Sequence, residues 1–471
     1  MLTNAKAQSC SCADLVKEVI SKTEHDYAGY IHKVKEKEGS SYLQFKQKLV
    51  RKATNVPFLK CYDLLEKYVS FFNDGHLFIV EIPPRQPDSL AATAKTYPIP
   101  GNYKLILKNR KKKDPIEGIW RAAGHIEIVV VKTGKRTFYG VIQHTTAPGW
   151  KPGMVKMEIE KVKENEYKIA YYRNDFTKIH FVKLHISKHV ALSFGVYRFA
   201  KAWPVNPESK YINPDDPQLP VFKLLNKNNV LLTIPSALID RSYLDSLLKK
   251  NDVIIKSTPN LIIDVRSNGG GNNIWGGVYA IANTTVRPKP KTYDGDDFLL
   301  LASEDDAIYI DNMSAYLKER KDSLGIKYYQ HVISNIRANV GRIIGFSFYS
   351  STPDTAKRPV YKYPKRIAVI IDKTVASAGE GFIIDLKEIS SKITLYGSNT
   401  YGMIDYMNVN TLPLGDKNCA WYYFGYPTFF AKDIKTKPNN PTGIKPDIYI
   451  PSNVSDWIEW VKNDLKNHKR N

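Results

Sequence analysis

The sequence predicts an α/β protein of several domains, α+β in overall character, with a mostly parallel central sheet. Two short runs, 261–265 and 367–371, are rich in β-branched residues, which is typical of strands buried on both faces. Each run leads through small residues into a segment of helical periodicity, and this alternation favours an α/β sheet. The length of 471 residues exceeds what one ordinary core accommodates and predicts two or three domains.

The first region, residues 1–82, is expected to be helical. Apolar residues recur at helical spacing between 12 and 72, and this pattern ends at the turn Asn73-Asp74-Gly75. His76 follows the turn and enters a predicted strand at 77–80. A single histidine after a turn is more often structural than functional, so the pattern alone assigns it no role.

The region 101–200 has the pattern of an antiparallel β-module, either a compact sheet or a barrel. Segments of β-forming residues alternate there with turns that contain Gly, Asn and Lys. Proline-rich stretches at 83–100 and 203–220 separate this module from its neighbours. Three histidines near its end do not share one strand face, so we expect ordinary strand residues there and no metal site.

The region 225–471 is predicted to hold the central sheet. A strand that ends at about 234, a helix at 240–250 and the strand 261–265 form a βαβ unit, which requires a mostly parallel sheet. The strand 366–371 and a helix at 378–389 extend it. An insertion at about 290–360 is interpreted as a cap without assigned chemistry.

Ser377 lies at the turn between the strand 366–371 and the following helix. Such a turn exposes a side-chain oxygen beside free backbone N–H groups and the positive end of a helix dipole, where an oxyanion is stabilised. Gly269 and Gly270 follow the other strand, and the carboxyl ends of the strands are where α/β sheets form their sites. The glycine spacing fits neither a dinucleotide-binding loop nor a P-loop. The alternative for Ser377 is a plain helix N-cap, with Glu380 completing a capping box.

Three motifs, in this order, resemble the core motifs of the S41 serine peptidases. They are Asp264-x-Arg266-x-Asn268-Gly-Gly-Gly271, Ser377-Ala-Gly-Glu380 and Gly443-Ile-Lys-Pro-Asp447. That family comprises the C-terminal processing peptidases, the tricorn protease core and retinoid-binding protein repeats. The resemblance covers about 225–455 well and the first 80 residues loosely. It implies a ClpP/crotonase-like ββα core and a serine peptidase that hydrolyses peptide bonds.

The resemblance also implies which residue is the general base. Asp74-Gly75-His76 looks like the segment that carries the base histidine in the tricorn type. The C-terminal processing branch uses a lysine, but Met403 stands at the matching position here, so a Ser-His pair is expected rather than a Ser-Lys dyad. The tricorn type has a glutamate shortly before the third motif, where this chain has Asn439-Asn440. Asp405 is therefore the candidate for the orienting carboxylate.

The expected reaction is acyl transfer to water through an acyl-enzyme on Ser377. Neutral His76 takes the hydroxyl proton of Ser377, which then attacks the peptide carbonyl. The backbone N–H groups of Ala378 and of Gly269 or Gly270 would receive the negative charge, and glycine is needed there because a side chain would block the approach. This chemistry uses no cofactor and no metal ion.

The formal net charge of +22 predicts a basic, solvated surface. Basic residues are spread along the chain without a known nucleic-acid motif, so nucleic acid is not the expected partner. No apolar run approaches the about 18 residues of a membrane span. The expected partner is a peptide or protein substrate, and the oligomeric state stays open. The alternatives are a catalytically inactive S41-like protein that binds peptides or lipophiles, and a basic polyanion binder.

The four cysteines form no C-x-x-C pair, which argues against a zinc or thioredoxin-type site. In an exported protein a disulfide would join Cys61 to Cys10 or Cys12, and the sequence leaves that choice open. Ala5-Lys-Ala7 has the small-x-small pattern of a signal cleavage site, although no apolar stretch precedes it. Together with the resemblance, this pattern leads us to expect export, either periplasmic or secreted.

Overall fold

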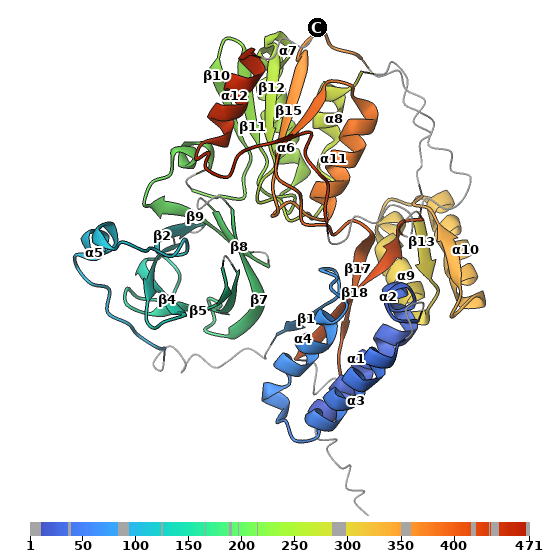
Figure 1. The fold of residues 1–471 in the computed structure, drawn as a ribbon. Helices are drawn as coiled ribbons and strands as arrows, with labels where there is room; N and C mark the ends of the chain where they lie inside the picture. Colours follow the sequence, from blue (N-terminus) through green and yellow to red (C-terminus); the bar gives the residue numbers. More distant parts are fainter. Residues whose placement is uncertain are drawn as a thin grey trace, which may run out of the picture. The chain divides into compact units, whose positions relative to one another are not determined.

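The computed structural model of the chain (Figure 1) divides into two compact units, each built from three separate stretches. The first unit comprises residues 1–83, 289–355 and 403–441. The second unit comprises residues 84–288, 356–402 and 442–471. The structure describes residues 11–35, 39–82, 94–123, 126–164, 166–187, 191–195, 197–213, 215–284, 298–349, 359–415, 421–432, 434 and 442–467.

The first unit contains an antiparallel sheet and helices. Its strand order is β1-β18-β13-β14, and β17 also pairs with β18. Because β1 pairs with β18, with Phe78 opposite Gly425, the segment after residue 403 groups with the N-terminal region and not with the central sheet. The elements are α1 (Cys12–Asp26), α2 (Ala28–Lys33), α3 (Ser40–Ala53), α4 (Tyr62–Ser70), β1 (Phe78–Glu81), β13 (Phe298–Leu301), α9 (Glu304–Glu319), α10 (Ser323–Ala338), β14 (Ile343–Phe346), β17 (Tyr406–Pro413) and β18 (Tyr422–Phe430).

A disulfide between Cys12 and Cys61 joins the first residue of α1 to the residue before α4. Cys12 is therefore the partner of Cys61, while Cys10 and Cys419 lie outside the described residues. The cross-link closes a loop with a sequence separation of 49. Loop-closure entropy for a ring of this size stabilises the folded chain by about 4 kcal/mol.

A six-stranded sheet forms the centre of the second unit, in the order β10-β11-β12-β15-β16-β19. All neighbouring pairs are parallel except β10 and β11, which pair antiparallel at one edge. The elements are β10 (Val221–Asn226), β11 (Asn229–Thr233), α6 (Arg241–Lys250), α7 (Asp252–Ser257), β12 (Asn260–Asp264), α8 (Gly276–Ala282), β15 (Arg366–Ile371), α11 (Ala378–Ile389), β16 (Ile393–Gly397), β19 (Ile448–Tyr449) and α12 (Trp457–Asn467).

Both faces of this sheet are buried, as the composition of its strands predicts. In β15, Val369 packs into one core cluster with side chains of α6, α8 and α11, whereas Ile370 packs into another with side chains of α12. The same alternation occurs in β12, where Ile263 and Ile262 belong to the two different clusters. Helices thus cover both faces, and the predicted α/β fold class is confirmed.

The other part of the second unit is a closed antiparallel barrel of eight strands, β2 to β9 (Figure 1). Alternate side chains point inward and form one apolar core that includes the fully buried Trp120. Lys156 is also fully buried in β5. The strands are β2 (Gly118–Ala122), β3 (Ile126–Lys132), β4 (Thr137–His144), β5 (Val155–Lys163), β6 (Glu166–Tyr172), β7 (Lys178–Ser187), β8 (Ala191–Phe194) and β9 (Tyr197–Trp203), and α5 (Tyr103–Asn109) precedes them.

Most of the elements expected from the sequence are present. The strands at 261–265 and 366–371 and the helix at 378–389 are confirmed within one or two residues. The aromatic runs at 421–424 and 428–430 belong to one continuous strand, β18. None of the helices in the described part of the chain is long and apolar enough to cross a membrane.

Candidate active site

Ser377 occupies the turn between β15 and α11, and its backbone is strained. Its φ of 53° and ψ of -123° lie outside the regions that residues with a side chain ordinarily adopt. Such a conformation costs about 1–3 kcal/mol, so the surrounding contacts must hold it in place. The side chain is half-buried, and α11 begins at the next residue, Ala378. The turn therefore presents the Ser377 hydroxyl at the positive end of a helix.

Glu380 is the residue that holds this turn. Its buried carboxylate accepts the Ser377 N–H through Oε2, at 3.2 Å. Its Oε1 accepts the Thr400 hydroxyl at 2.5 Å and the Gly402 N–H at 2.9 Å. A carboxylate in the first turn of a helix is also stabilised by the helix dipole. The predicted role of Glu380 as the capping carboxylate is confirmed by its bond to the Ser377 N–H.

The glycine loop, residues 268–271, lies directly against Ser377. Gly270 has a φ of +97°, and a Cβ atom there would stand 2.8 Å from Cβ of Ser377 and 2.9 Å from N of Ala378. Asn268 binds the loop from both sides, because its main-chain O accepts the N–H of the residue before Ser377 at 3.1 Å and its Oδ1 accepts the Gly270 N–H at 3.1 Å. Only glycine fits at position 270.

Two backbone N–H groups beside Ser377 are available to receive a negative charge. Within the residues that the structure describes, the N–H groups of Gly269 and Ala378 have no acceptor, whereas the Gly270 N–H donates to Asn268. Gly269 is exposed, and a Cβ atom on it would meet nothing within 4 Å. The arrangement therefore offers Gly269 and Ala378 as donors to an oxyanion.

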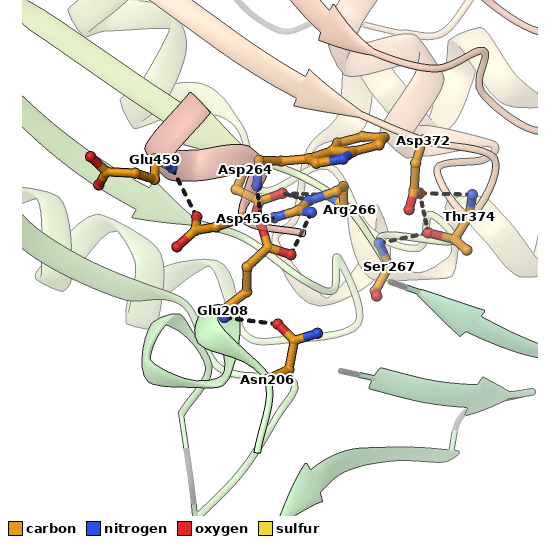
Figure 2. Close-up of polar contacts among 10 residues, drawn as sticks. Asn206, Glu208, Asp264, Arg266, Ser267, Asp372, Thr374, Asp456 and Glu459 are labelled. Atoms are coloured by element: carbon orange, nitrogen blue, oxygen red, sulfur yellow. Dashed lines mark hydrogen bonds and ion pairs between the residues drawn. The ribbon is translucent and has the colours of Figure 1, made fainter. Parts of the chain in front are cut away.

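Arg266 anchors the strand end from which the glycine loop departs (Figure 2). Its Nη1 and Nη2 donate to the two carboxylate oxygens of Glu208, both at 2.9 Å. Its Nη2 and Nε donate to Asp264 at 2.7 and 2.9 Å. All three side chains are buried, and Glu208 also accepts the N–H of Trp457 at 2.8 Å, at the start of α12. Burial lowers the pKa of Arg266, but the two carboxylates outweigh it and raise that pKa well above its ordinary value.

Ser267 connects this ion-pair network to the turn before Ser377 (Figure 2). It is buried and has a φ of 70°, which is strained for a residue with a side chain. Its N–H donates to Oγ1 of Thr374 at 2.8 Å, and the Thr374 hydroxyl in turn donates to Asp372. Both partners lie just after β15, so the glycine loop and the turn at Ser377 are fixed to each other by buried polar contacts.

His76 lies in the first unit, shortly before β1, and is 7% exposed. Its Nδ1 lies 2.6 Å from the carbonyl oxygen of Tyr406. Because a carbonyl only accepts, Nδ1 carries the hydrogen, and the lone pair of the neutral ring is on Nε2. The main-chain N–H of His76 donates to Oδ1 of Asp74 at 2.9 Å, which holds the turn. Asp74 also accepts the Tyr27 hydroxyl at 2.7 Å.

Residues 403–406 pack against the turn that carries His76. A Cβ atom on Gly75 would come within 2.5 Å of Sδ of Met403, so Met403 covers this glycine. Asp405 is buried, and its main-chain oxygen accepts the Ala431 N–H at 2.9 Å. His76 and Asp405 belong to the first unit, and Ser377, Ala378, Gly269 and Gly270 belong to the second.

Sequence reasoning did not identify two of the supporting groups. The carbonyl of Tyr406 gave no signal, because every residue carries one. Glu208 lies in the Pro-rich stretch that was interpreted as a boundary, and only the buried Arg266 would have indicated that a second carboxylate was needed. Asp447, the last residue of the third motif, has a structural role, because it binds Lys387 and the Leu395 N–H, both at 2.8 Å.

Comparison with known proteins identifies one family. Residues 230–450 match the model of peptidase family S41. Mature CPAF complexed with lactacystin is a similar solved structure, with 14% identity, a TM-score of 0.49 and coverage of 93% of this chain and 94% of that chain. Another is the photosystem II D1 C-terminal processing protease, with 13% identity, a TM-score of 0.37 and coverage of 95% and 96%. No curated protein matches the chain in sequence.

A lipoprotein from Streptococcus agalactiae is also similar, with 13% identity, a TM-score of 0.41 and coverage of 98% of this chain and 99% of that chain. Identities and TM-scores this low assign no role to any residue. The family match contains the glycine loop and Ser377, whereas His76 precedes it. Residues 230–450 of the chain are thus similar to peptidase family S41.

Proposed function

We propose that the chain is a serine-type peptidase that hydrolyses peptide bonds through an acyl-enzyme on Ser377. The observation that carries this proposal is the strained backbone of Ser377, with φ of 53°, at the start of α11 and in contact with Gly270. A plain helix cap does not require a conformation that costs about 1–3 kcal/mol. A nucleophile does benefit from it, because the turn lifts the hydroxyl toward a substrate and beside N–H donors.

In the proposed reaction Oγ of Ser377 attacks the carbonyl carbon of the peptide bond while Nε2 of His76 takes its proton. The electron pair of the carbonyl moves to its oxygen, and the N–H groups of Gly269 and Ala378 bind that oxyanion. The imidazolium then gives its proton to the leaving amine as the C–N bond breaks. Water repeats the sequence on the acyl-enzyme and releases the carboxylic acid. Each oxyanion donor contributes about 3 kcal/mol to lowering the barrier.

The tautomer of His76 supports its role as the base. Because the Tyr406 carbonyl accepts the Nδ1 hydrogen at 2.6 Å, Nε2 is the nitrogen able to take a proton. A main-chain carbonyl thus performs part of the orienting role that the sequence suggested for Asp405. We assign to Asp405 the second part, which is to provide negative charge that stabilises the imidazolium. The short stretch 400–406 contacts both His76 and Glu380. The carbonyl of Tyr406 accepts from His76, and Thr400 and Gly402 donate to Glu380.

We also propose a substrate class and export, the first supported by this chemistry and the second by the disulfide. An acyl-enzyme mechanism with two N–H donors is suited to peptides and proteins with a scissile amide. The Cys12–Cys61 disulfide supports an oxidising compartment, such as the periplasm or the extracellular space, because cytosolic thiols are kept reduced.

A fluorophosphonate probe tests the proposal, since it labels only an activated serine. Labelling of Ser377 is expected in the full chain, followed by mass spectrometry of the modified peptide. Ser377→Ala should abolish the adduct, and His76→Ala should reduce the labelling rate at least about 100-fold, in the range that general-base catalysis contributes.

His25→Ala is the matched control, because His25 is an exposed histidine of the same unit. It should label like the unchanged chain. If the folded chain takes up no probe, or if His76→Ala labels as fast as His25→Ala, the proposed mechanism is wrong. The first of these results would favour a non-catalytic protein that binds peptides or lipophiles.

A further inference from the structure

A cavity of about 430 Å³ opens at one rim of the eight-stranded barrel. The turns β2–β3 and β6–β7 and the first residues of β9 lie at this rim, and each contributes to the lining. The lining residues are Ala122, Ala123, Ile126, Tyr171, Arg173, Asn174, Asp175, Tyr197, Arg198, Phe199 and Gln218. None of them belongs to the candidate active site, so the cavity has no role yet.

The charges around this rim cavity favour an anion. Its lining holds two guanidinium groups, Arg173 and Arg198, and one carboxylate, Asp175, whose Oδ1 lies 4.0 Å from Nε of Arg173. The ammonium of Lys156 lies behind the lining, where its Nζ donates to Oδ1 of Asn174 at 3.1 Å. Positive groups therefore outnumber the one acid of the lining, and a cavity wall of low dielectric strengthens their effect on a ligand.

Two of these cations are shielded from water without sufficient compensation, since Lys156 is buried and Arg198 is half-buried. Burial lowers the pKa of Arg198 to about 10, although Asp216 acts in the opposite direction. Burial likewise lowers the pKa of Lys156 to about 7, against the effect of Asp175. A buried cation whose pKa stays lowered gains free energy when an anion binds beside it. The two residues thus contribute affinity for an anion that a surface arginine would not.

The walls of the rim cavity are aromatic and aliphatic. The rings of Tyr171 and Tyr197 lie 4.4 Å apart, centroid to centroid, and Phe199 and Ile126 are buried beside them. Such walls suit a ligand that carries an apolar side chain next to its charged group, because ligand pockets combine apolar walls with a few polar groups. We propose that the rim cavity binds an acidic peptide segment, in which a carboxylate meets Arg173 and Arg198 while an adjacent apolar side chain meets Tyr171 and Tyr197.

Arg198 has the donors that this role requires. A guanidinium carries five N–H donors. Within the described residues, Nη1 donates to the carbonyl oxygen of Pro235 and Nη2 donates to that of Ser267. These two bonds fix the orientation of the guanidinium and leave three N–H groups for a carboxylate in the cavity.

The same contacts connect the rim cavity with the glycine loop. Pro235 follows β11 and Ser267 follows β12, so Arg198 reaches the carboxyl ends of the parallel strands from the barrel. Ser267 directly precedes Asn268, whose side chain accepts the Gly270 N–H. Arg198 therefore contacts the residue that precedes the glycine loop, and this loop contacts Ser377. The proposal deepens the peptidase function and rests on it for the choice of a peptide as ligand.

The test is direct binding to the full chain carrying Ser377→Ala, which removes turnover. Fluorescence anisotropy is measured with three fluorescein-labelled peptides. The first ends in Ala-Ala-Leu with a free carboxyl end, the second is the same peptide with an amidated end, and the third is amidated and ends in Ala-Glu-Leu. Binding of the first or third at least about 10-fold tighter than the second is expected, in line with one charge-assisted contact. The comparison of the first with the third tells whether a chain end or an acidic side chain supplies the carboxylate.

Arg173→Met identifies the site of binding. It should weaken the carboxylate-bearing peptides about 10-fold while leaving the neutral peptide unchanged. Arg136→Met is the control, because Arg136 is an exposed arginine in the turn between β3 and β4, at the opposite rim. Equal affinity for all three peptides, or equal affinity of the Arg173→Met and Arg136→Met chains, would overturn the proposal. This readout does not use Ser377, so its failure is distinct from a failure of fluorophosphonate labelling.

Discussion

Arg266 and Lys156 are both buried cations of the second unit, but their surroundings differ. Arg266 is bound by two carboxylates, Glu208 and Asp264, at 2.7 to 2.9 Å. Lys156 has a neutral partner, Asn174, and its ammonium lies 3.8 Å from the centroid of the Trp150 ring. The pKa of Arg266 is raised in spite of burial, whereas burial lowers the pKa of Lys156 to about 7.

This difference means that one buried cation holds its surroundings firmly and the other does not. A cation between two carboxylates keeps its charge and its geometry at every physiological pH, which suits the support of the glycine loop. A lysine that a neutral amide and an aromatic ring surround can lose its proton near neutral pH, so its interaction with the barrel rim changes with conditions. The ion pairs that support the candidate active site therefore stay charged, whereas the charge of Lys156 behind the rim cavity changes with pH.

Removing Arg266 should have the largest effect on stability. Arg266→Met leaves Glu208 and Asp264 as two buried carboxylates without their cation, and breaking such a pair typically costs about 3–5 kcal/mol. Faster hydrogen exchange of the amides in β12 and β15 would measure this loss. The control is Arg241→Met, whose pair with Asp245 is exposed and worth about 0–1 kcal/mol. Equal effects of the two variants would mean that the buried network does not support the sheet.

Gly270→Ala tests the loop that Arg266 anchors. The added Cβ would stand 2.8 Å from Cβ of Ser377 at a φ of +97°, so the loop and the nucleophile must move apart. A displacement of this size should slow fluorophosphonate labelling about 100-fold. Gly101→Ala is the control, because a Cβ at Gly101 meets nothing within 4 Å. Labelling of the Gly270→Ala chain at the rate of the control would contradict a direct role of the loop.

The sequence predicted the position of this loop because the evidence lies in short, continuous segments of the chain. The runs 261–265 and 366–371 carry the composition of buried parallel strands, and parallel strands end at the same edge of a sheet. That rule puts the loop after one strand next to the turn after the other, and Gly270 and Ser377 do lie in contact. The strained φ of Ser377 was not predictable, because the same residues also fit a plain cap.

The remaining parts depend on contacts between distant residues. Barrel closure between β2 and β9 is decided by strand number and stagger, which the alternation of residues in each strand does not reveal. The pairing of Phe78 with Gly425 moved the segment after 403 into the first unit, and no local pattern indicates that partner. Glu208 looked like part of a linker, and its burial became evident only together with Arg266.

Lys156→Met should stabilise the barrel, and the gain should depend on pH. The folded pKa of about 7 lies below the ordinary value of 10.5, so the unfolded chain binds more protons between these values and the stability of the unchanged barrel rises with pH across that window. The variant should therefore gain several kcal/mol near pH 6 and progressively less toward pH 10. Hydrogen exchange of β5 and β6, compared with the unchanged chain at each pH, measures the gain.

Lys168→Met is the control for this substitution, because Lys168 is exposed on β6. It should change the stability of the barrel by less than about 0.5 kcal/mol at either pH. A destabilised Lys156→Met barrel at low pH would mean that the contact with the Trp150 ring outweighs the unfavourable burial of the ammonium.

Asp26 in the first unit provides the opposite sign and the smallest expected effect. Burial and the neighbouring Asp305, opposed by Lys22, raise its pKa from 3.8 to about 7. The folded chain therefore binds more protons than the unfolded chain between these values, and the contribution of Asp26 to stability is lost as pH rises from about 4 to about 7. Asp26→Asn removes this dependence and, relative to the unchanged chain, should stabilise the first unit by a few kcal/mol more at pH 8 than at pH 4.

Urea unfolding of the unchanged chain and of Asp26→Asn at the two pH values measures this difference, with Asp311→Asn as the control because Asp311 is exposed. The Asp311→Asn chain should follow the unchanged chain at both. If Asp26→Asn is instead less stable than the unchanged chain at pH 8, Asp26 is ionised in the folded unit and Lys22 is its effective partner. One cation, Lys22, would then suffice to keep two neighbouring carboxylates, Asp26 and Asp305, charged. The comparison of Arg266 with Lys156 does not include such a shared cation.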